Sequence, residues 1–210
     1  MALAKQNSVN VSHRRKNEGR KNERKDARTL RTRARINAAF AQLLHRRPYG
    51  DIRVSDITRK AGVGRATFYA HYSEKDDLLR SQFERGVAPM LVASPDDPSL
   101  LDATRLFAHI GSGRHFYKAL MGPSGGTAPR VLRDCFETHV RNVLSLDPVL
   151  KPGLKQATIA RFVASSLLTI TECWLEHGGR ETPQQVQALF ANLVSPGLRA
   201  CRDTALQEEA

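Results

Sequence analysis

The sequence has little of what secreted, membrane-spanning or disordered proteins require. Its 210 residues include only three cysteines, an odd number that suits a reducing cytoplasm better than a disulfide framework. No run of uncharged apolar residues approaches about 18, the length that a membrane helix needs. No apolar block follows the basic N-terminus, which argues against secretion, and an apolar content of 40% excludes disorder of the whole chain. We therefore expect a cytoplasmic protein with a packed core and no membrane partner.

Motifs of catalysis and metal binding are missing as well. The chain has neither a Gly-x-Ser-x-Gly nucleophile elbow nor a phosphate-binding P-loop, so we expect neither an enzyme nor catalytic residues. It also lacks the Cys-x-x-Cys spacing of a zinc site, so we expect no metal and no cofactor. Cys135 and His139 share one face of a predicted helix, which leaves a metal sensor as a minor alternative. A cysteine redox sensor is another, although lone helical cysteines are usually small buried hydrophobes.

Positive charge is abundant and is concentrated at one end of the chain. Residues 1–35 hold twelve Lys and Arg against three Asp and Glu, and residues 36–75 hold seven against three. Residues 76–210 hold fourteen against fifteen, so the first third accounts for the net charge of +12. Such asymmetry indicates a polyanionic partner, most often nucleic acid. A solvated basic tail that only aids solubility is the simpler alternative.

The apolar residues recur with the period of helices, and no segment alternates with the period of a strand. The sequence therefore predicts an all-α fold. Capping residues, glycines and prolines set the expected ends of the helices, with capping boxes expected at Ser73–Asp76 and at Thr182–Gln185. The predicted helices cover about 29–47, 54–61, 65–72, 74–87, 99–110, 115–121, 129–145, 155–177 and 183–203.

Two short predicted helices joined by a glycine-containing turn have the outline of a helix-turn-helix. Ile57, Ala61 and Val63 should hold the two helices together, and Gly62 supplies a backbone conformation that other residues disfavour. Phe68 should face inward. Four side chains of the second helix should then face outward, where they can contact a DNA groove. They are Arg65, Thr67, Tyr69 and His71.

The segment from Ile52 to Leu79 carries a recognisable signature, and it reads Ile-Arg-Val-Ser-Asp-Ile-Thr-Arg-Lys-Ala-Gly-Val-Gly-Arg-Ala-Thr-Phe-Tyr-Ala-His-Tyr-Ser-Glu-Lys-Asp-Asp-Leu-Leu. With this segment and the preceding helix over 33–44, the chain resembles the TetR family of bacterial transcriptional regulators over about residues 28–90. The resemblance implies a homodimer with an N-terminal DNA-reading domain. It also implies a C-terminal helical domain that dimerises through its last two long helices and often holds an inducer.

Two residues depart from the family pattern. Arg53 stands where the family usually has a capping Ser or Thr, and Gly64 stands where it often has Ser. Glycine is an acceptable N-cap, whereas arginine offers no acceptor. Either Arg53 contacts phosphate, or its helix starts one residue late.

The outward placement and the resemblance together predict the residues that contact DNA. Arg65 is the candidate for bidentate reading of guanine, with a contact to phosphate alone as the alternative. Tyr69 and Lys75 resemble family positions that touch the DNA backbone. Tyr72 is expected to be packed with its hydroxyl on a phosphate, and His71 either contacts DNA or is solvated. The full predicted set is Arg53, Ser55, Arg65, Ala66, Thr67, Tyr69, His71, Tyr72 and Lys75.

The C-terminal half resembles the family more loosely. The segment from Phe162 to Gly178 and the helix after it are similar to a subtype that also occurs in a coactivator of dihydroxyacetone metabolism, the DhaS type. Ordinary core packing is the alternative for each residue that we expect to line an inducer pocket. These residues are Phe107, Phe116, Met121, His139 and Trp174.

These observations lead to one functional hypothesis. We expect a homodimeric repressor that binds a pseudo-palindromic operator in double-stranded DNA and is released by a small-molecule inducer. A DhaS-type coactivator that acts through a protein partner and a sequence-neutral DNA-coating protein are the alternatives. We assign residues 1–28 to a disordered basic arm, 29–93 to the three-helix helix-turn-helix DNA-binding domain with its connecting helix, 99–203 to the helical dimerisation and ligand-binding domain, and 204–210 to a tail.

Overall fold

Helices form almost everywhere that apolar residues recur at helical spacing, and the all-α prediction is confirmed. The computed structural model describes residues 26–93, 101–122, 125–146 and 153–207. An N-terminal helix occupies residues 26–44. The later elements are η1 (Tyr49–Asp51), α2 (Val54–Ala61), α3 (Arg65–Tyr69), α4 (Lys75–Gly86), η2 (Ala88–Met90), β1 (Val92–Ala93), β2 (Leu101–Asp102), α5 (Thr104–Ser112), α6 (Arg114–Met121), α7 (Ala128–Leu144), α8 (Leu154–Glu176) and α9 (Pro183–Gln207).

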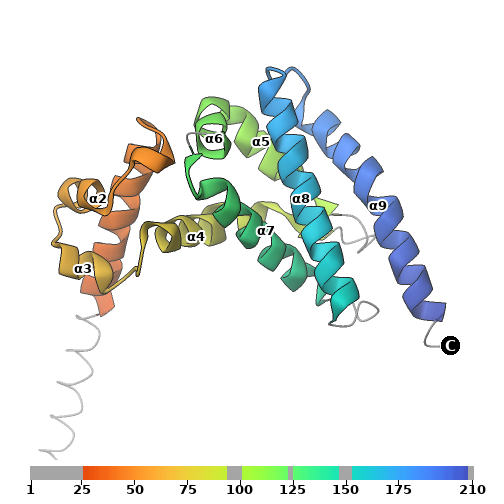
Figure 1. Cartoon of the computed structure of the whole chain (residues 1–210), viewed down its shortest axis with the longest axis horizontal. Helices are drawn as coiled ribbons and strands as arrows, with labels where there is room; N and C mark the ends of the chain where they lie inside the picture. The colour runs from red at the N-terminus through yellow and green to blue at the C-terminus, as the bar shows by residue number, and fades with distance from the viewer. Residues whose placement is uncertain (1–25, 94–100, 123–124, 147–152, 208–210) are drawn as a thin grey trace, which may run out of the picture.

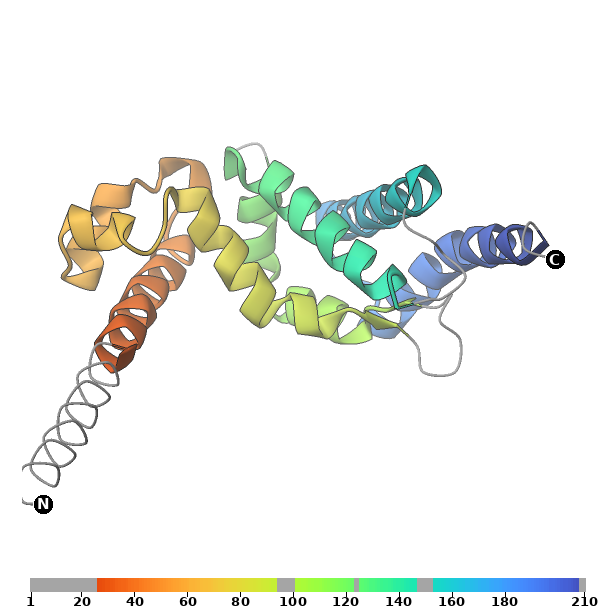
Figure 2. The same cartoon turned by 90° about the horizontal axis from the view of Figure 1, so that it is seen from below.

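The connecting helix α4 joins the two ends of an elongated molecule. Figure 1 shows α2 and α3 at one end and α8 and α9 at the other, and the view in Figure 2 keeps this order along the long axis. On one side, Gln82 of α4 donates to the Asn37 side chain of the N-terminal helix at 3.0 Å. On the other side, Phe83 meets Phe136 of α7 edge to face, with ring centroids 4.6 Å apart. Movement of α4 therefore affects both domains.

The N-terminal core is built on the apolar stripe of the helix over 26–44. Ile36, Phe40, Leu43 and Leu44 are buried, as their helical spacing predicted. They belong to one cluster with buried residues of the following helices, which are Ile57, Ala61, Phe68, Leu78 and Leu79. This core holds α2 and α3 in place, so a fixed scaffold presents the outward face of α3.

The turn between α2 and α3 requires glycine at position 62, as predicted. Gly62 has a φ of 62°, in the left-handed region that favours glycine. A Cβ there would also lie 2.8 Å from the guanidinium of Arg35. Arg35 donates to the Gly62 carbonyl at 3.0 Å. The N-terminal helix therefore helps to fix the turn, a role of Arg35 that the sequence did not reveal.

Three boundaries in the N-terminal domain differ from prediction. Residues 26–28, expected in the arm, are helical, and the rest of the predicted arm lies outside the described residues. The N-terminal helix ends at residue 44 rather than near 47, and the amides of Arg46 and Arg47 both donate to the Leu43 carbonyl in the turn that follows. Helix α3 ends at Tyr69 rather than near residue 72. A bond from the His71 amide to the Phe68 carbonyl, at 2.9 Å, tightens its last turn.

The junction between the domains contains a short β-ribbon that the sequence did not predict. Strands β1 and β2 pair antiparallel, with Val92 opposite Asp102. Helix α5 consequently begins at Thr104 rather than near residue 99. The carboxylate of Asp102 accepts the Thr104 amide at 2.8 Å. The break predicted at 94–99 lies outside the described residues.

The start of α4 differs by one residue from the predicted capping box, in which Ser73 caps the helix and Asp76 is the acidic partner. Glu74 is instead the N-cap residue. The carboxylate of Asp77 accepts the amides of Ser73 at 3.0 Å and Glu74 at 3.2 Å. Asp76 therefore has no capping role and is buried, with 8% of its surface exposed.

Helices α7 and α8 begin and end one residue earlier than predicted. The predicted capping box of α9 is confirmed, because Thr182 and Gln185 each accept the other's amide with their side chains. Gly178 and Gly179 follow α8 with φ values of 85° and 57°. Helix α9 runs through Pro196 to Gln207, so part of the predicted tail is helical.

Candidate nucleic-acid interface

The outward face of α3 is the most exposed surface of the helix-turn-helix. Arg65, Ala66, Thr67 and Tyr69 are all exposed, and Tyr69 keeps 54% of its surface accessible. Phe68, between them, is completely buried. The Arg65 guanidinium has no hydrogen-bond or ion-pair partner among the residues that the structure describes. Four of the predicted DNA-contacting residues therefore lie together on one free surface.

The start of α2 explains how arginine can occupy a capping position. The Arg53 side chain makes no capping hydrogen bond. Instead, the carboxylate of Asp56 accepts the Arg53 amide at 3.0 Å. This backbone hydrogen bond, together with nearby arginines, lowers the pKa of Asp56. The Arg53 side chain is left exposed, and Ser55 beside it is half-buried.

Tyr72 is packed, as we expected, but its hydroxyl has a partner within the domain. Its surface is 5% exposed, and its hydroxyl donates to the Asn37 side chain at 3.3 Å. The Arg33 guanidinium lies over its ring, 5.7 Å from the centroid. With its hydroxyl directed into the domain, Tyr72 positions the N-terminal helix against α3, and its contact with a phosphate stays a prediction. The preceding His71 is half-buried.

Lys75 is also tied to the protein rather than extended toward solvent. Its ammonium donates to the carbonyls of Tyr49 and Ile52, at 2.7 and 2.9 Å. It also lies 4.0 Å from the centroid of the Tyr49 ring. Burial lowers its pKa, while the nearby Asp76 and Asp51 carboxylates act in the opposite direction. Lys75 thus fixes η1 to α4 through these two carbonyls, and its contact with the DNA backbone stays a prediction.

A buried carboxylate joins the two domains at η1. Asp76 accepts hydrogen bonds from the Tyr49 hydroxyl and from the Thr127 hydroxyl, the latter at 2.9 Å. Thr127 precedes α7, whereas Tyr49 belongs to the DNA-reading domain. Beside this link, a Cβ on Gly126 would lie 3.1 Å from the Cα of Gly50. Sequence reasoning missed this link because only the fold brings the three side chains together.

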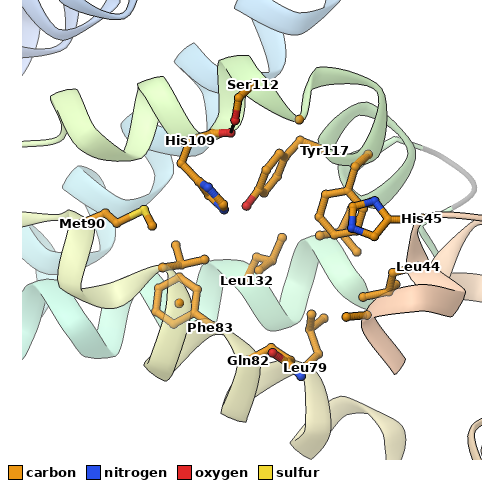
Figure 3. A pocket seen from close by; sticks show the side chains of 16 residues that line it. Leu44, His45, Leu79, Gln82, Phe83, Met90, His109, Ser112, Tyr117 and Leu132 are labelled. Carbon is orange, nitrogen blue, oxygen red and sulfur yellow. Dashed lines mark hydrogen bonds between the residues drawn. The ribbon is translucent and has the colours of Figure 1, made fainter. Parts of the chain in front are cut away.

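A cavity of about 550 Å³ lies between the domains, and Figure 3 shows its lining. Of the five predicted pocket residues, only Phe116 lines it. The N-terminal helix, α4, η2 and α5–α7 all contribute to its walls. The other lining residues are Ala41, Leu44, His45, Leu79, Gln82, Phe83, Gly86, Val87, Met90, His109, Ser112, Gly113, Tyr117, Leu120 and Leu132.

The other four predicted pocket residues lie elsewhere. Phe107 and Trp174 pack edge to face in the core of the C-terminal domain, with centroids 6.2 Å apart. Met121 is also buried there. The imidazole Nε2 of His139 lies 2.8 Å from the Leu91 carbonyl oxygen. For Phe107 and Met121, packing in the core accounts for the apolar pattern that had suggested a pocket. A separate hollow of about 320 Å³ does include Trp174, between α8 and α9.

Within the described ranges, no group of three or more His, Cys, Asp or Glu residues could hold a metal ion. Burial raises the pKa of the Cys135 thiol to about 11, so this thiol is protonated at neutral pH. In the same part of the chain, no helix is long and apolar enough to cross a membrane.

Large apolar side chains are exposed on the two helices farthest from α3. Phe162 of α8 is 55% exposed, and Leu189 and Leu193 of α9 are 51% and 60% exposed. Helices α8 and α9 pack side by side (Figure 1). Large apolar side chains left exposed on a pair of packed helices commonly mark an interface with another chain.

Two family models match successive parts of the chain. Residues 36–81 match the family described as bacterial regulatory proteins, tetR family. Residues 102–196 match one described as transcriptional regulator C-terminal region. The first match spans most of the DNA-reading domain with most of α4, and the second runs from the end of β2 to Pro196 in α9. Both halves therefore match parts of bacterial regulators.

Individual proteins give the same picture. YxbF, an uncharacterized HTH-type transcriptional regulator of Bacillus subtilis (strain 168), is 33% identical over 132 residues, which are 57% of this chain and 33% of YxbF. This chain thus spans about a third of that curated relative. A TetR transcriptional regulator from Streptococcus agalactiae 2603V has the same fold, with a TM-score of 0.52 and 23% identity over 81% of this chain and 97% of its own. The dihydroxyacetone kinase operon activator DhaS aligns over 80% of this chain and 97% of its own, at a TM-score of 0.48 and 20% identity.

Proposed function

Because this chain belongs to the TetR family of bacterial regulatory proteins, we propose that it is a sequence-specific DNA-binding transcriptional regulator rather than an enzyme. The observation that carries the proposal is the exposed face of α3, held by a buried Phe68 on a fixed helix-turn-helix. Arg65 reads a base in the major groove, and Thr67 and Tyr69 contact bases or backbone beside it. Arg53 and Ser55 at the start of α2 contact the DNA backbone.

The reading domain works in pairs. The exposed Phe162, Leu189 and Leu193 support a homodimer in which α8 and α9 of one protomer pack on those of its partner. Such a dimer presents two copies of α3 to a pseudo-palindromic operator, with half-sites about 34 Å or a multiple of that apart. The net charge of the first 75 residues attracts any DNA, and α3 selects the sequence.

The regulator acts as a repressor in the cytoplasm and is released by a small molecule. The support for release is the cavity of about 550 Å³ between the reading domain and the C-terminal domain. A ligand that binds one arrangement of the domains better than another shifts the dimer toward that arrangement. When that arrangement no longer fits the half-site spacing, the dimer leaves its operator.

Selection from a random DNA library by the purified protein, at about 150 mM salt, tests the proposal. Enrichment of a two-fold symmetric motif is the expected result. The variant R65A should enrich the same motif with one base position relaxed in each half-site. Retention of DNA with no motif would contradict sequence-specific reading and would leave only electrostatic attraction.

A further inference from the structure

The cavity between the domains has apolar walls drawn from both of them. Leu44 comes from the N-terminal helix, Leu79 and Phe83 from α4, and Leu120 and Leu132 from α6 and α7. Its volume of about 550 Å³ lies in the range of sites that bind small organic molecules. A molecule in this space touches the reading domain, the connecting helix and the C-terminal domain at the same time.

Tyr117 is a buried residue whose hydroxyl faces this space. Tyr117 is 8% exposed, and its hydroxyl has no hydrogen-bond partner within the ranges that the structure covers. Figure 3 shows the hydroxyl of Tyr117 and the imidazole of His109 turned toward the middle of the cavity. Their rings meet edge to face, with centroids 5.7 Å apart. Burial raises the pKa of Tyr117 to about 12, so the hydroxyl keeps its proton and can donate.

The other polar groups in the lining are already engaged or lie at the edge. The Gln82 amide donates to Asn37, and the Ser112 hydroxyl donates to the His109 carbonyl at 2.8 Å. The ring of His45 packs against Phe116, with centroids 5.1 Å apart. Away from that edge, an occupant therefore meets two polar side chains with no hydrogen bond to the described residues, the Tyr117 hydroxyl and the imidazole of His109, a residue that is itself exposed.

No Asp, Glu, Lys or Arg is among the residues that line the cavity. A charged molecule would lose its hydration there without gaining a countercharge. A basic hollow of about 410 Å³ does lie on the other side of the His45 and Phe116 rings. Two of its arginines are engaged, since Arg47 pairs with Asp56 and Arg114 donates to the Gly178 carbonyl. The cavity itself therefore favours a neutral occupant.

We propose that this cavity is the effector site, and that it takes a neutral, mostly apolar molecule whose carbonyl or other acceptor oxygen binds the Tyr117 hydroxyl and His109. The proposal rests on the proposed function in one respect only, which is that a molecule bound in the cavity changes the affinity for DNA. Since α4 and the N-terminal helix form part of the wall, the occupant sets the angle between the reading domain and the C-terminal domain. Binding of the molecule itself requires no DNA.

Equilibrium dialysis of the full chain without DNA tests the site with three probes of similar shape. Benzophenone is neutral and has a carbonyl, diphenylmethane lacks the carbonyl, and 4-benzoylbenzoate adds a negative charge. We expect benzophenone to bind about three- to tenfold more tightly than diphenylmethane, the effect of one hydrogen bond. We expect 4-benzoylbenzoate to bind about tenfold more weakly than benzophenone. Tighter binding of the charged probe would overturn the assigned ligand class.

Three variants locate the effect. Y117F removes only the hydroxyl and should reduce the preference for benzophenone, since His109 remains as the one polar partner of the carbonyl, while diphenylmethane binds as before. G86L adds a side chain where a Cβ meets nothing within 4 Å, so it should weaken both neutral probes without disturbing the fold. L146W adds bulk at an exposed leucine outside the cavity and should change neither. An unchanged preference in Y117F would overturn the role of Tyr117.

Irradiation of bound benzophenone locates the probe directly. The excited ketone inserts into a nearby C–H bond, which forms a C–C bond and converts the carbonyl to an alcohol. Mass spectrometry should find the label on peptides that contain Met90 or Leu132. Labels elsewhere, or no saturable binding of any probe, would overturn the site. A protein that binds benzophenone here but selects no DNA motif would contradict the proposed function and leave the binding site intact.

Discussion

The face of α3 and the outer face of the α8–α9 pair are both exposed, but they are exposed for opposite kinds of contact. On the first, α3 presents Arg65 and Thr67. On the second, α8 and α9 present Phe162, Leu189 and Leu193. Charge and hydroxyl groups suit a hydrated, charged partner, whereas large apolar groups gain free energy when they leave water. Under the proposed function, the two ends of the molecule therefore address different partners, DNA and a second copy of the chain.

The helices beneath these two surfaces are held in place by different kinds of contact. The α8–α9 pair is held by buried apolar side chains such as Val163, Leu167 and Phe190. The small reading domain adds polar ties to backbone carbonyls, from Arg35 to Gly62 and from Lys75 to Tyr49. Such ties hold short helices that bury little apolar surface. Substitutions in one surface only can test whether α3 serves DNA binding and the α8–α9 pair serves dimerisation.

The largest effect is expected from a charge in the apolar face. In L193E a carboxylate replaces a side chain that is 60% exposed in the single chain. The buried charge should separate the dimer, and DNA affinity should then fall by about 100- to 10,000-fold because two linked reading domains become one. Sedimentation and a gel-shift titration measure the two effects. The control L146E changes a leucine that is 81% exposed and outside α8 and α9. A dimer that survives L193E would show that this face is not the interface.

A smaller effect is expected at the other surface. R65A removes the free guanidinium from α3 and should cost about 1–3 kcal/mol of binding free energy, with specificity relaxed at one base position. The protein should remain dimeric and equally stable, since Arg65 is exposed. The control R105A removes the same charge from an exposed position on α5. A uniform loss of affinity on every DNA sequence would reassign Arg65 to phosphate.

The sequence predicted α2, the turn at Gly62 and the burial of Phe68 well, because these depend on local spacing and backbone preference. It also predicted the free face of α3. The sequence did not predict those features of the site that depend on contacts between residues far apart in the chain. Helical spacing shows that Phe107 and Trp174 face inward, but it cannot tell a filled core from a cavity. Likewise, Tyr72 and Asp76 have partners that only the tertiary fold supplies.

The link between the two ends gives the next prediction. Y49F removes the hydroxyl that donates to the buried Asp76 carboxylate and leaves the ring in place. A hydrogen bond to a charged group is worth about 1.5 kcal/mol, so the free energy of unfolding in urea should fall by about that amount. The control Y69F changes an exposed tyrosine and should leave stability unchanged. Equal stability of Y49F and the wild type would contradict a structural role for the link.

The smallest effect is expected at the start of α2 and depends on pH. The pKa of Asp56 is lowered, first by the hydrogen bond from the Arg53 amide, so the folded state favours the carboxylate. The stability that this hydrogen bond provides is present above the unfolded pKa of about 4 and is lost as pH falls through the folded value. D56A should therefore be less stable than the wild type at pH 7, and the difference should shrink toward pH 3. Urea unfolding at both pH values measures it, and a difference that does not change with pH would show that the charge of Asp56 plays no part in capping α2.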